Sequence, residues 1–249
     1  MKNVIVVKDL VKKFGKTTAV DSISFTVKKG EIFALIGPNG AGKSTTLRIL
    51  ATVLAPTSGE VGIYDYDINQ DASKIRQIMT YLPEEAGSYK NMTGMSYLKF
   101  MAAMFSDSRK EQEEYLTFAQ HIAGLGDRLK TKLSSYSKGM VRKLLLARTV
   151  MSKPRLTILD EPTSGLDVTN ALFIRKTIQD LTKQGMTVLL SSHNMLEIEF
   201  LSDRVGMIHK GKITGIGSSQ DLMKKYKVQN LEEVFEAITH VNSEGNTDL

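Results

Sequence analysis

Gly37-Pro38-Asn39-Gly40-Ala41-Gly42-Lys43-Ser44-Thr45 is the stretch that decides the fold, because it matches the pattern G-x-x-x-x-G-K-[ST]. The apolar run 31–36 before it is typical of a buried strand, and residues 46–50 after it follow a helical pattern. Glycines at such a turn let backbone N–H groups approach an anion, and the positive end of the helix adds to the attraction. A glycine-rich turn without a ligand is the alternative, but the context favours a loop that binds nucleotide phosphates.

Two polar side chains of this loop have specific expected tasks. We expect Lys43 to reach the β- and γ-phosphates and the Ser44 hydroxyl to hold Mg²⁺. The backbone of the remaining loop residues would surround the phosphates.

Length and composition place the chain among ordinary globular proteins. Its 249 residues suffice for one large domain or a core with an inserted subdomain, and 41% of them are hydrophobic. It has neither the run of roughly 18 apolar residues that a membrane span needs nor a secretory signal, so we expect a cytosolic chain. The absence of cysteine excludes disulfides and thiolate metal sites. The formal charge of +6 comes from scattered Lys and Arg, so we expect a solvated basic surface and no nucleic-acid partner.

The alternation of apolar runs and helical patterns predicts an α/β fold. Short β-branched runs at 4–10 and 19–27 predict antiparallel strands. Further strands are predicted at 60–64, 79–82, 156–161, 187–192, 204–209 and 212–216, and helices at 72–78, at 168–183 and twice between 218 and 239. Asp71 is expected to cap the helix that begins at residue 72. We therefore predict a phosphate-loop core with a mostly parallel sheet and an antiparallel β edge.

Residues 88–150 change to helical spacing and predict an inserted α-helical subdomain. Its methionines, with Met104 among them, are expected to pack in the core, and an adaptable binding surface is the alternative. The chain then divides into a first part of the core with the phosphate loop (1–87), the helical subdomain (88–150), a second part of the core (151–217) and C-terminal helices with a polar tail (218–249).

Three single residues each have two interpretations on local physics. Phe14, beside a glycine, would either stack on adenine or pack as a core residue, and the local pattern favours the core. Ser137 would either cap the following helix, the ordinary reading, or mark a second anion site. His193, which leaves a strand, is either structural or a donor to a γ-phosphate oxygen.

Two adjacent carboxylates end the strand 156–161. Because side chains alternate along a strand, Asp160 and Glu161 should point in different directions and take separate tasks, one near Mg²⁺ and one holding a water for attack on the γ-phosphate. The carboxyl ends of parallel strands meet at one edge of a sheet, which places the pair near the phosphate loop. An exposed pair that opens a loop is the alternative.

These motifs together resemble the nucleotide-binding subunit of ATP-binding-cassette (ABC) transporters over nearly the whole chain. GPNGAGKST resembles the Walker A loop, LTILDE the Walker B strand, YSKGM the signature usually written LSGGQ, SGLD the D-loop with Asp167, and SSH the switch histidine. By the same resemblance Phe14 matches the aromatic residue that stacks on adenine. The signature residues expected at a partner's ATP are Ser137, Lys138 and Gly139.

The resemblance implies that two subunits pack head to tail with two ATP molecules in their interface, so that a monomer hydrolyses poorly. In the implied reaction Glu161 is the general base, His193 stabilises the γ-phosphate and Lys43 neutralises charge. The implied metal partners are Ser44, Asp160 and Glu84.

Two motifs depart from the family pattern. Glu84 occupies the place of the Q-loop glutamine, where an ionised carboxylate can approach Mg²⁺ but cannot donate a hydrogen bond. The signature departs from the consensus at Tyr136, Lys138 and Met140 and keeps the serine and the second glycine.

The implied role is an ATPase subunit that drives export through a separate transmembrane permease at the cytoplasmic face of the membrane. Docking is expected through the helical subdomain and the Glu84 loop, and YLPEE together with residues 230–235 resembles exporters of sodium, drugs or antibiotics. One rival is a soluble cassette ATPase acting on nucleic acid or protein assembly, which usually has two cassettes or long coiled coils. Another is a regulatory nucleotide-binding module, which the Asp160–Glu161 pair argues against. The transported substrate is not encoded in this chain.

Overall fold

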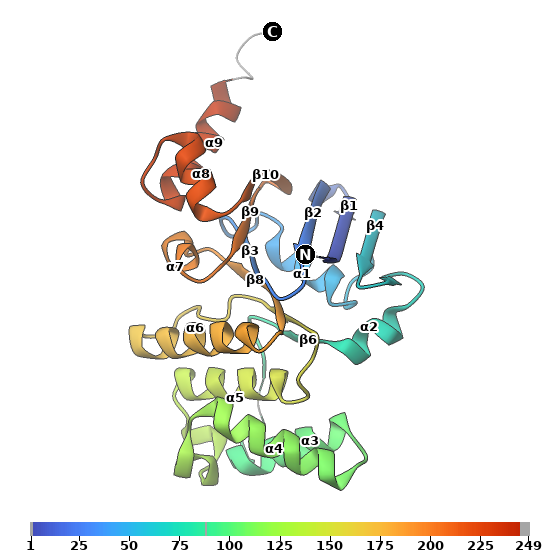
Figure 1. The fold of residues 1–249 in the computed structure, drawn as a ribbon, viewed down its shortest axis with the longest axis vertical. Coiled ribbons are helices and arrows are strands. Elements are labelled where there is room, and N and C mark those ends of the chain that lie inside the picture. Colours follow the sequence, from blue (N-terminus) through green and yellow to red (C-terminus); the bar gives the residue numbers. More distant parts are fainter. Residues whose placement is uncertain (1, 88, 245–249) are drawn as a thin grey trace.

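The structure is a computed structural model that describes residues 2–87 and 89–244, and it confirms the predicted α/β class (Figure 1). Six strands form the larger sheet in the order β10-β9-β3-β8-β7-β6, and all pairs are parallel except β10 with β9. Its strands are β3 (Ile32–Ile36), β6 (Met79–Leu82), β7 (Leu156–Leu159), β8 (Thr187–Ser192), β9 (Arg204–His209) and β10 (Lys212–Gly217).

A second, antiparallel sheet has the order β2-β1-β4-β5. Its strands are β1 (Asn3–Phe14), β2 (Thr17–Lys28), β4 (Ser58–Ile63) and β5 (Tyr66–Asp67). One buried apolar cluster joins both sheets to helix α1 (Lys43–Leu50), because Ile5 and Val7 of one sheet and Phe33 and Leu35 of the other belong to it together with Leu47. The helix that follows the phosphate loop is thus fixed between the two sheets.

Helices cover the larger sheet and extend from it at both ends of the molecule (Figure 1). At one end lie α3 (Gly94–Phe105), α4 (Arg109–Ala123) and α5 (Lys138–Val150), with the 3₁₀ turns η1 (Gly126–Lys130) and η2 (Leu133–Ser135) between α4 and α5. At the other end lie α8 (Ser219–Tyr226) and α9 (Leu231–Glu244). The remaining helices are α2 (Ala72–Ile78), α6 (Val168–Lys183) and α7 (Met195–Glu199).

Local chemistry explains these boundaries. β3 is buried at every residue, as expected for a central parallel strand that is covered on both faces. Helix α4 begins where Ser108 accepts a hydrogen bond from the Glu111 N–H, and it ends at Gly124, whose φ of +60° suits glycine. Among the described residues, no helix is both long and apolar enough to cross a bilayer.

The structure departs from the sequence predictions in four places. The antiparallel strands form a sheet of their own rather than an edge of the parallel sheet. Asp71 precedes α2 but makes no capping hydrogen bond, because its carboxylate accepts instead from Lys74 and from the Asp67 N–H. Met104 is 69% exposed and not a core residue. The short helix α7 was not predicted, and residues 245–249 of the expected polar tail lie outside the described residues.

Candidate functional site

The phosphate loop joins β3 to α1, and its glycines adopt backbone angles that side chains rarely take. Gly40 has a φ of +77°, and Gly42, at the N-cap of α1, has a φ of +107°. A Cβ at Gly42 would lie 2.5 Å from the carbonyl oxygen of Ala19, so this glycine packs directly against β2. A helix leaves its first N–H groups without intrahelical partners, so the start of α1 can receive phosphate oxygens.

Lys43 is the first residue of α1, and its side chain is buried between the loop and a carboxylate. Its Nζ donates to the carbonyl oxygens of Gly37 at 2.7 Å and Pro38 at 3.2 Å. The same ammonium lies 3.4 Å from Oε1 of Glu161. The expected phosphate-binding lysine and the expected base therefore meet in one buried place.

Asp160 lies directly after β7, beside the hydroxyl group of the phosphate loop. Its Oδ1 accepts from Ser44 Oγ at 3.0 Å and from Ser191 Oγ at 2.6 Å, and its Oδ2 accepts from the Tyr81 hydroxyl at 3.4 Å. Burial and the negative charge of Asp160 raise the pKa of Tyr81 to about 12, so the tyrosine stays protonated and can donate. Hydroxyl and carboxylate oxygens in contact fit the oxygen preference of Mg²⁺.

Glu161 has an unusual backbone conformation that directs its side chain. Its φ is +48°, which is rare for a residue other than glycine. Its Oε2 lies 2.9 Å from Nδ1 of His193. Its Oε1 is buried and faces Lys43, and within the described part of the chain it has no hydrogen-bond partner. Asp160 and Glu161 do have separate partners, but the reason predicted from the sequence is wrong. Since β7 ends at Leu159, a left-handed turn rather than strand alternation separates the two carboxylates.

The signature segment lies at the start of α5 and touches the D-loop of the same chain. Ser137 caps α5 by accepting from the Met140 N–H at 3.2 Å, which confirms the capping interpretation. A Cβ at Gly139 would collide with the side chain of Asn170, and Asn170 in turn donates to Asp167 at the N-cap of α6.

Lys138, which was expected to contact a partner's ATP, instead contacts the D-loop of its own chain. Its Nζ lies so close to Gly165 of the D-loop that a Cβ added at this glycine would collide with it. The signature and the D-loop are therefore packed as one unit, and a contact of Lys138 with a partner's ATP stays a prediction.

Phe14 is 50% exposed at the end of β1, so the local preference for a core residue is wrong. The Nζ of Lys12 lies 5.0 Å from the centre of its ring, and the turn at Gly15 follows directly. An exposed ring next to a turn is suited to stacking on a planar ligand, and its contact with adenine stays a prediction.

Glu84 is exposed, and it lines a hollow together with Lys138, Arg142 and Glu161 that includes no residue of the phosphate loop. Within residues 2–87 and 89–244, no group of three or more His, Asp or Glu side chains is placed to hold a metal ion, and a contact of Glu84 with Mg²⁺ stays a prediction. The backbone carbonyl oxygen of Glu84, rather than its carboxylate, accepts a hydrogen bond from Arg142 Nη1 at 3.1 Å.

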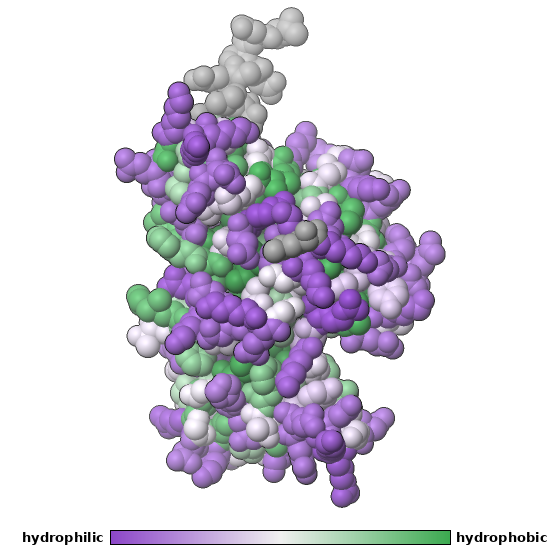
Figure 2. All heavy atoms as spheres, viewed as in Figure 1, coloured by the Kyte–Doolittle hydropathy of each residue, from purple (hydrophilic) through white to green (hydrophobic). Residues whose placement is uncertain are grey.

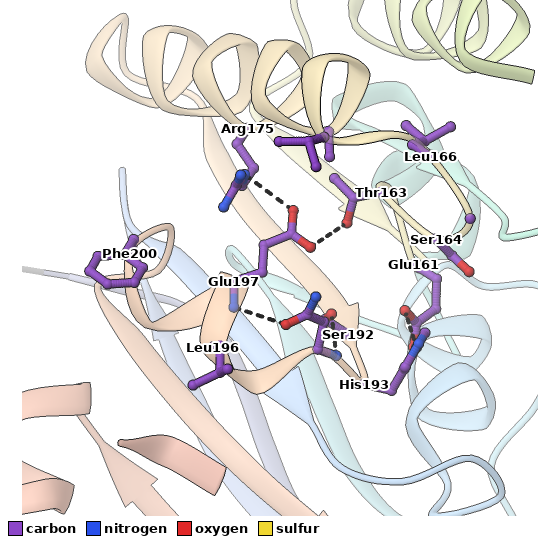
Figure 3. Close-up of a pocket in the computed structure, with 14 residues that line it drawn as sticks. Glu161, Thr163, Ser164, Leu166, Arg175, Ser192, His193, Leu196, Glu197 and Phe200 are labelled. Atoms are coloured by element: carbon purple, nitrogen blue, oxygen red, sulfur yellow. Dashed lines mark hydrogen bonds and ion pairs between the residues drawn. The ribbon is translucent and has the colours of Figure 1, made fainter. Parts of the chain in front are cut away.

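Sequence reasoning missed several residues that shape this site. Arg142 and Ser191 contact the backbone of the Asp160–Glu161 segment. The sequence signal that could have indicated Arg142 was a charge on the apolar face of a helix, and the signal for Ser191 was a hydroxyl at the end of an apolar strand. A hollow of about 450 Å³ opens beside Glu161 and His193 (Figure 3). Its lining includes Glu197 of the unpredicted helix α7, which accepts from Thr163 Oγ1.

The fold and the site geometry define a phosphate-loop nucleotide-binding protein, and comparisons with known proteins give the family. A model of the family described as ABC transporter matches residues 20–164. The linearmycin resistance ATP-binding protein LnrL of Bacillus subtilis (strain 168) is 35% identical over 94% of this chain and 79% of its own length. The lantibiotic transport ATP-binding protein SrtF of Streptococcus pyogenes is 36% identical over 92% of this chain and 94% of its own.

Solved structures agree with these sequence relatives. The structure of an ATP-binding subunit of an ABC transporter has a TM-score of 0.84 and 28% identity, and it covers 95% of this chain and 99% of that one. A dimeric cassette in a post-hydrolysis state with ADP and Pi shares the fold, with a TM-score of 0.77, 24% identity and coverage of 86% and 98%. The chain belongs to the ABC transporter family and is the ATP-binding and ATP-hydrolysing subunit of such a transporter.

Proposed function

We propose that two copies of this chain pack head to tail around two ATP molecules and energise export through a transmembrane permease. The observation that carries the proposal is the contact of Glu161 with both Lys43 and His193 beside the phosphate loop, where Lys43 and Glu161 are buried and His193 is exposed. Relatives named for linearmycin resistance and lantibiotic transport support an antibiotic-like substrate. They favour transport over an action on nucleic acid, so we expect no nucleic-acid partner. The work would take place at the cytoplasmic face of the membrane.

In the proposed reaction, the side chains of Lys43, Glu161 and His193 bind the γ-phosphate and prepare a water. Lys43 neutralises phosphate charge, and the loop backbone holds the remaining phosphate oxygens. Within the described residues Glu161 Oε1 accepts no hydrogen bond and faces the Lys43 ammonium, and it is the oxygen that would accept a proton from the attacking water. His193 is held through Nδ1 by Glu161, which leaves Nε2 for a γ-phosphate oxygen. Phe14 stacks on the adenine.

Ser44 and Asp160 would hold Mg²⁺, and Glu84 is a further candidate ligand. Bound there, Mg²⁺ would neutralise charge on the β- and γ-phosphate oxygens. The hydrogen bonds from Ser191 and Tyr81 fix the orientation of the Asp160 carboxylate, as partners of a metal ligand generally do.

A second copy would complete each site with its signature. Ser137 and the N-terminus of α5 offer hydrogen-bond donors and a positive helix end to the partner's γ-phosphate. Most of the surface shown in Figure 2 is hydrophilic, but hydrophobic side chains gather on its left side, at the level of α6 and α7. Val168, Leu196 and Phe200, each at least 45% exposed, line the hollow beside Glu161 and fit contact with a second copy.

The permease would dock in a groove between β6 and α3. Met101, Phe105, Arg76 and Arg148 line this hollow of about 280 Å³, and Met104 is exposed on the same helix α3. Apolar side chains flanked by two arginines fit a short helix of the partner that carries apolar and acidic residues. Phe105→Glu should abolish co-purification with a membrane protein encoded beside this chain, whereas Ile216→Glu, on the distant strand β10, should not. Equal co-purification by both variants would contradict this groove as the docking site.

The dimer is tested by light scattering of the Glu161→Gln protein with and without Mg-ATP. A change from monomer to dimer only with Mg-ATP is expected, because ATP remains bound when hydrolysis is blocked. A monomer under both conditions, with ATP bound, would contradict a homodimer closed by ATP alone.

A further inference from the structure

Arg142 lies on the buried face of α5, and among the described residues every hydrogen bond of its guanidinium goes to a backbone carbonyl oxygen. Its Nη2 donates to Asp160 at 2.8 Å and Glu161 at 2.7 Å, and its Nε donates to Pro162 at 2.8 Å. Its Nη1 donates to Pro83 and Glu84, both at 3.1 Å. A guanidinium has five N–H groups, and five carbonyl oxygens of two loops use all of them.

We propose that Arg142 is a positioning residue for ATP hydrolysis, which holds the backbone of Glu161 and links it to both the signature helix and the Glu84 loop. The inference rests on the proposed role of Glu161 as the base. Because Arg142 holds the backbone of the segment that carries Glu161, in the proposed reaction it acts through Glu161.

The backbone of Glu161 explains why such a residue is needed. A left-handed conformation costs a non-glycine residue free energy and persists only when its surroundings enforce it. Here the Glu161 N–H donates to Ser191 Oγ at 3.0 Å while the Glu161 carbonyl accepts from Arg142, so the peptide groups on both sides of the Cα are held. Without one of these bonds, the segment can relax toward an ordinary conformation, which moves the carboxylate away from the water it must meet.

The position of Arg142 also joins three parts of the site into one body. It is five residues beyond Ser137, the signature serine at the N-cap of the same helix. A displacement of α5 on contact with a partner's ATP therefore acts directly on the carbonyls of Glu161 and Glu84. Burial lowers the pKa of the Arg142 guanidinium, although an arginine stays charged at physiological pH.

The test compares Arg142→Lys with Lys143→Met in the full chain. The lysine keeps the charge but has three donors for five carbonyls, whereas Lys143 is the next residue and packs its amine over the ring of Phe173. For Arg142→Lys we expect kcat to fall about 10²-fold, the scale for a misplaced reacting group, with unchanged ATP affinity and KM. Lys143→Met should leave all three quantities unchanged.

Two further measurements separate positioning from a general loss of structure. The first is thermal unfolding, which must show that the Arg142→Lys protein is folded. The second is turnover of the double variant: when Arg142→Lys is added to Glu161→Gln, the residual turnover should equal that of Glu161→Gln alone, because both changes act through one group. An unchanged kcat, or an equal loss in both backgrounds, would overturn the inference. If Arg142→Lys does not fold, Arg142→Gln replaces it, and failure of both to fold would also overturn a positioning role. Full activity of Glu161→Gln alone would instead overturn the proposed base.

Discussion

Arg175 and Glu197 form an ion pair that fixes α7 against α6, with Nε and Oε1 separated by 3.2 Å and the two side chains only 22% and 10% exposed (Figure 3). The other carboxylate oxygen of Glu197 accepts from Thr163 Oγ1 at 3.1 Å. Because α7 begins two residues after His193, the contacts of Glu197 fix the segment that carries the histidine and tie it to Thr163, the residue before the D-loop.

Arg175→Met should therefore destabilise the protein by about 2 kcal/mol, since it leaves the largely buried Glu197 carboxylate without its cation. The partial exposure of the pair keeps this loss below that of a fully buried pair. The double variant Arg175→Met/Glu197→Gln should lose less than the sum of the two single changes. Urea unfolding measures both effects. Lys130→Met, which breaks an exposed pair with Asp127, serves as the control and should change stability little. Additive losses would show that the pair contributes nothing as a pair.

The sequence predicts the elements of the core well because their signals are local. The phosphate loop, the two carboxylates and the strand that leads to His193 all follow from apolar runs that end in polar residues. Helix α7 has only five residues and no room for a periodic pattern, and the pair between Glu197 and Arg175 holds it against α6. The role of Arg142 was equally hidden, because its partners are backbone carbonyls, which carry no sequence signature. The Lys138 position at the D-loop also depends on tertiary packing.

Glu161→Gln should lower ATP turnover by roughly 10²- to 10⁴-fold, the usual contribution of a general base, because the amide cannot accept the proton of the attacking water. ATP affinity should remain, since Lys43 and the loop backbone are unchanged. Steady-state turnover and equilibrium binding of a fluorescent ATP analogue measure the two quantities. Glu60→Gln, on the exposed face of β4, is the control carboxylate and should keep full turnover. Turnover of Glu161→Gln close to wild type would rule out this residue as the base.

Gly42→Ala and Gly40→Ala should differ in their effect on stability, although both add one methyl group to the phosphate loop. Both positions have positive φ, so each alanine costs about 1–2 kcal/mol in backbone strain. At Gly42 the new Cβ would also meet the Ala19 carbonyl oxygen at 2.5 Å, whereas no neighbouring atom of the described residues lies within 4 Å of a Cβ at Gly40. The clash adds about 1–3 kcal/mol at Gly42, the usual cost of overpacking. Chemical denaturation would show equal losses at the two sites if the contact with β2 were unimportant.

Ser137→Ala should lose stability and ATP-dependent dimerisation together, whereas Ser218→Ala should lose only stability. Both serines are N-caps with similar geometry, because Ser137 accepts from the Met140 N–H at 3.2 Å and Ser218 from the Asp221 N–H at 3.1 Å. Loss of either cap should cost about 1 kcal/mol in urea unfolding. Only the N-terminus of α5 is expected to face a partner's γ-phosphate, so light scattering in the Glu161→Gln background should detect no dimer with Mg-ATP for Ser137→Ala. A dimer that forms equally well with both substitutions would restrict Ser137 to its capping role.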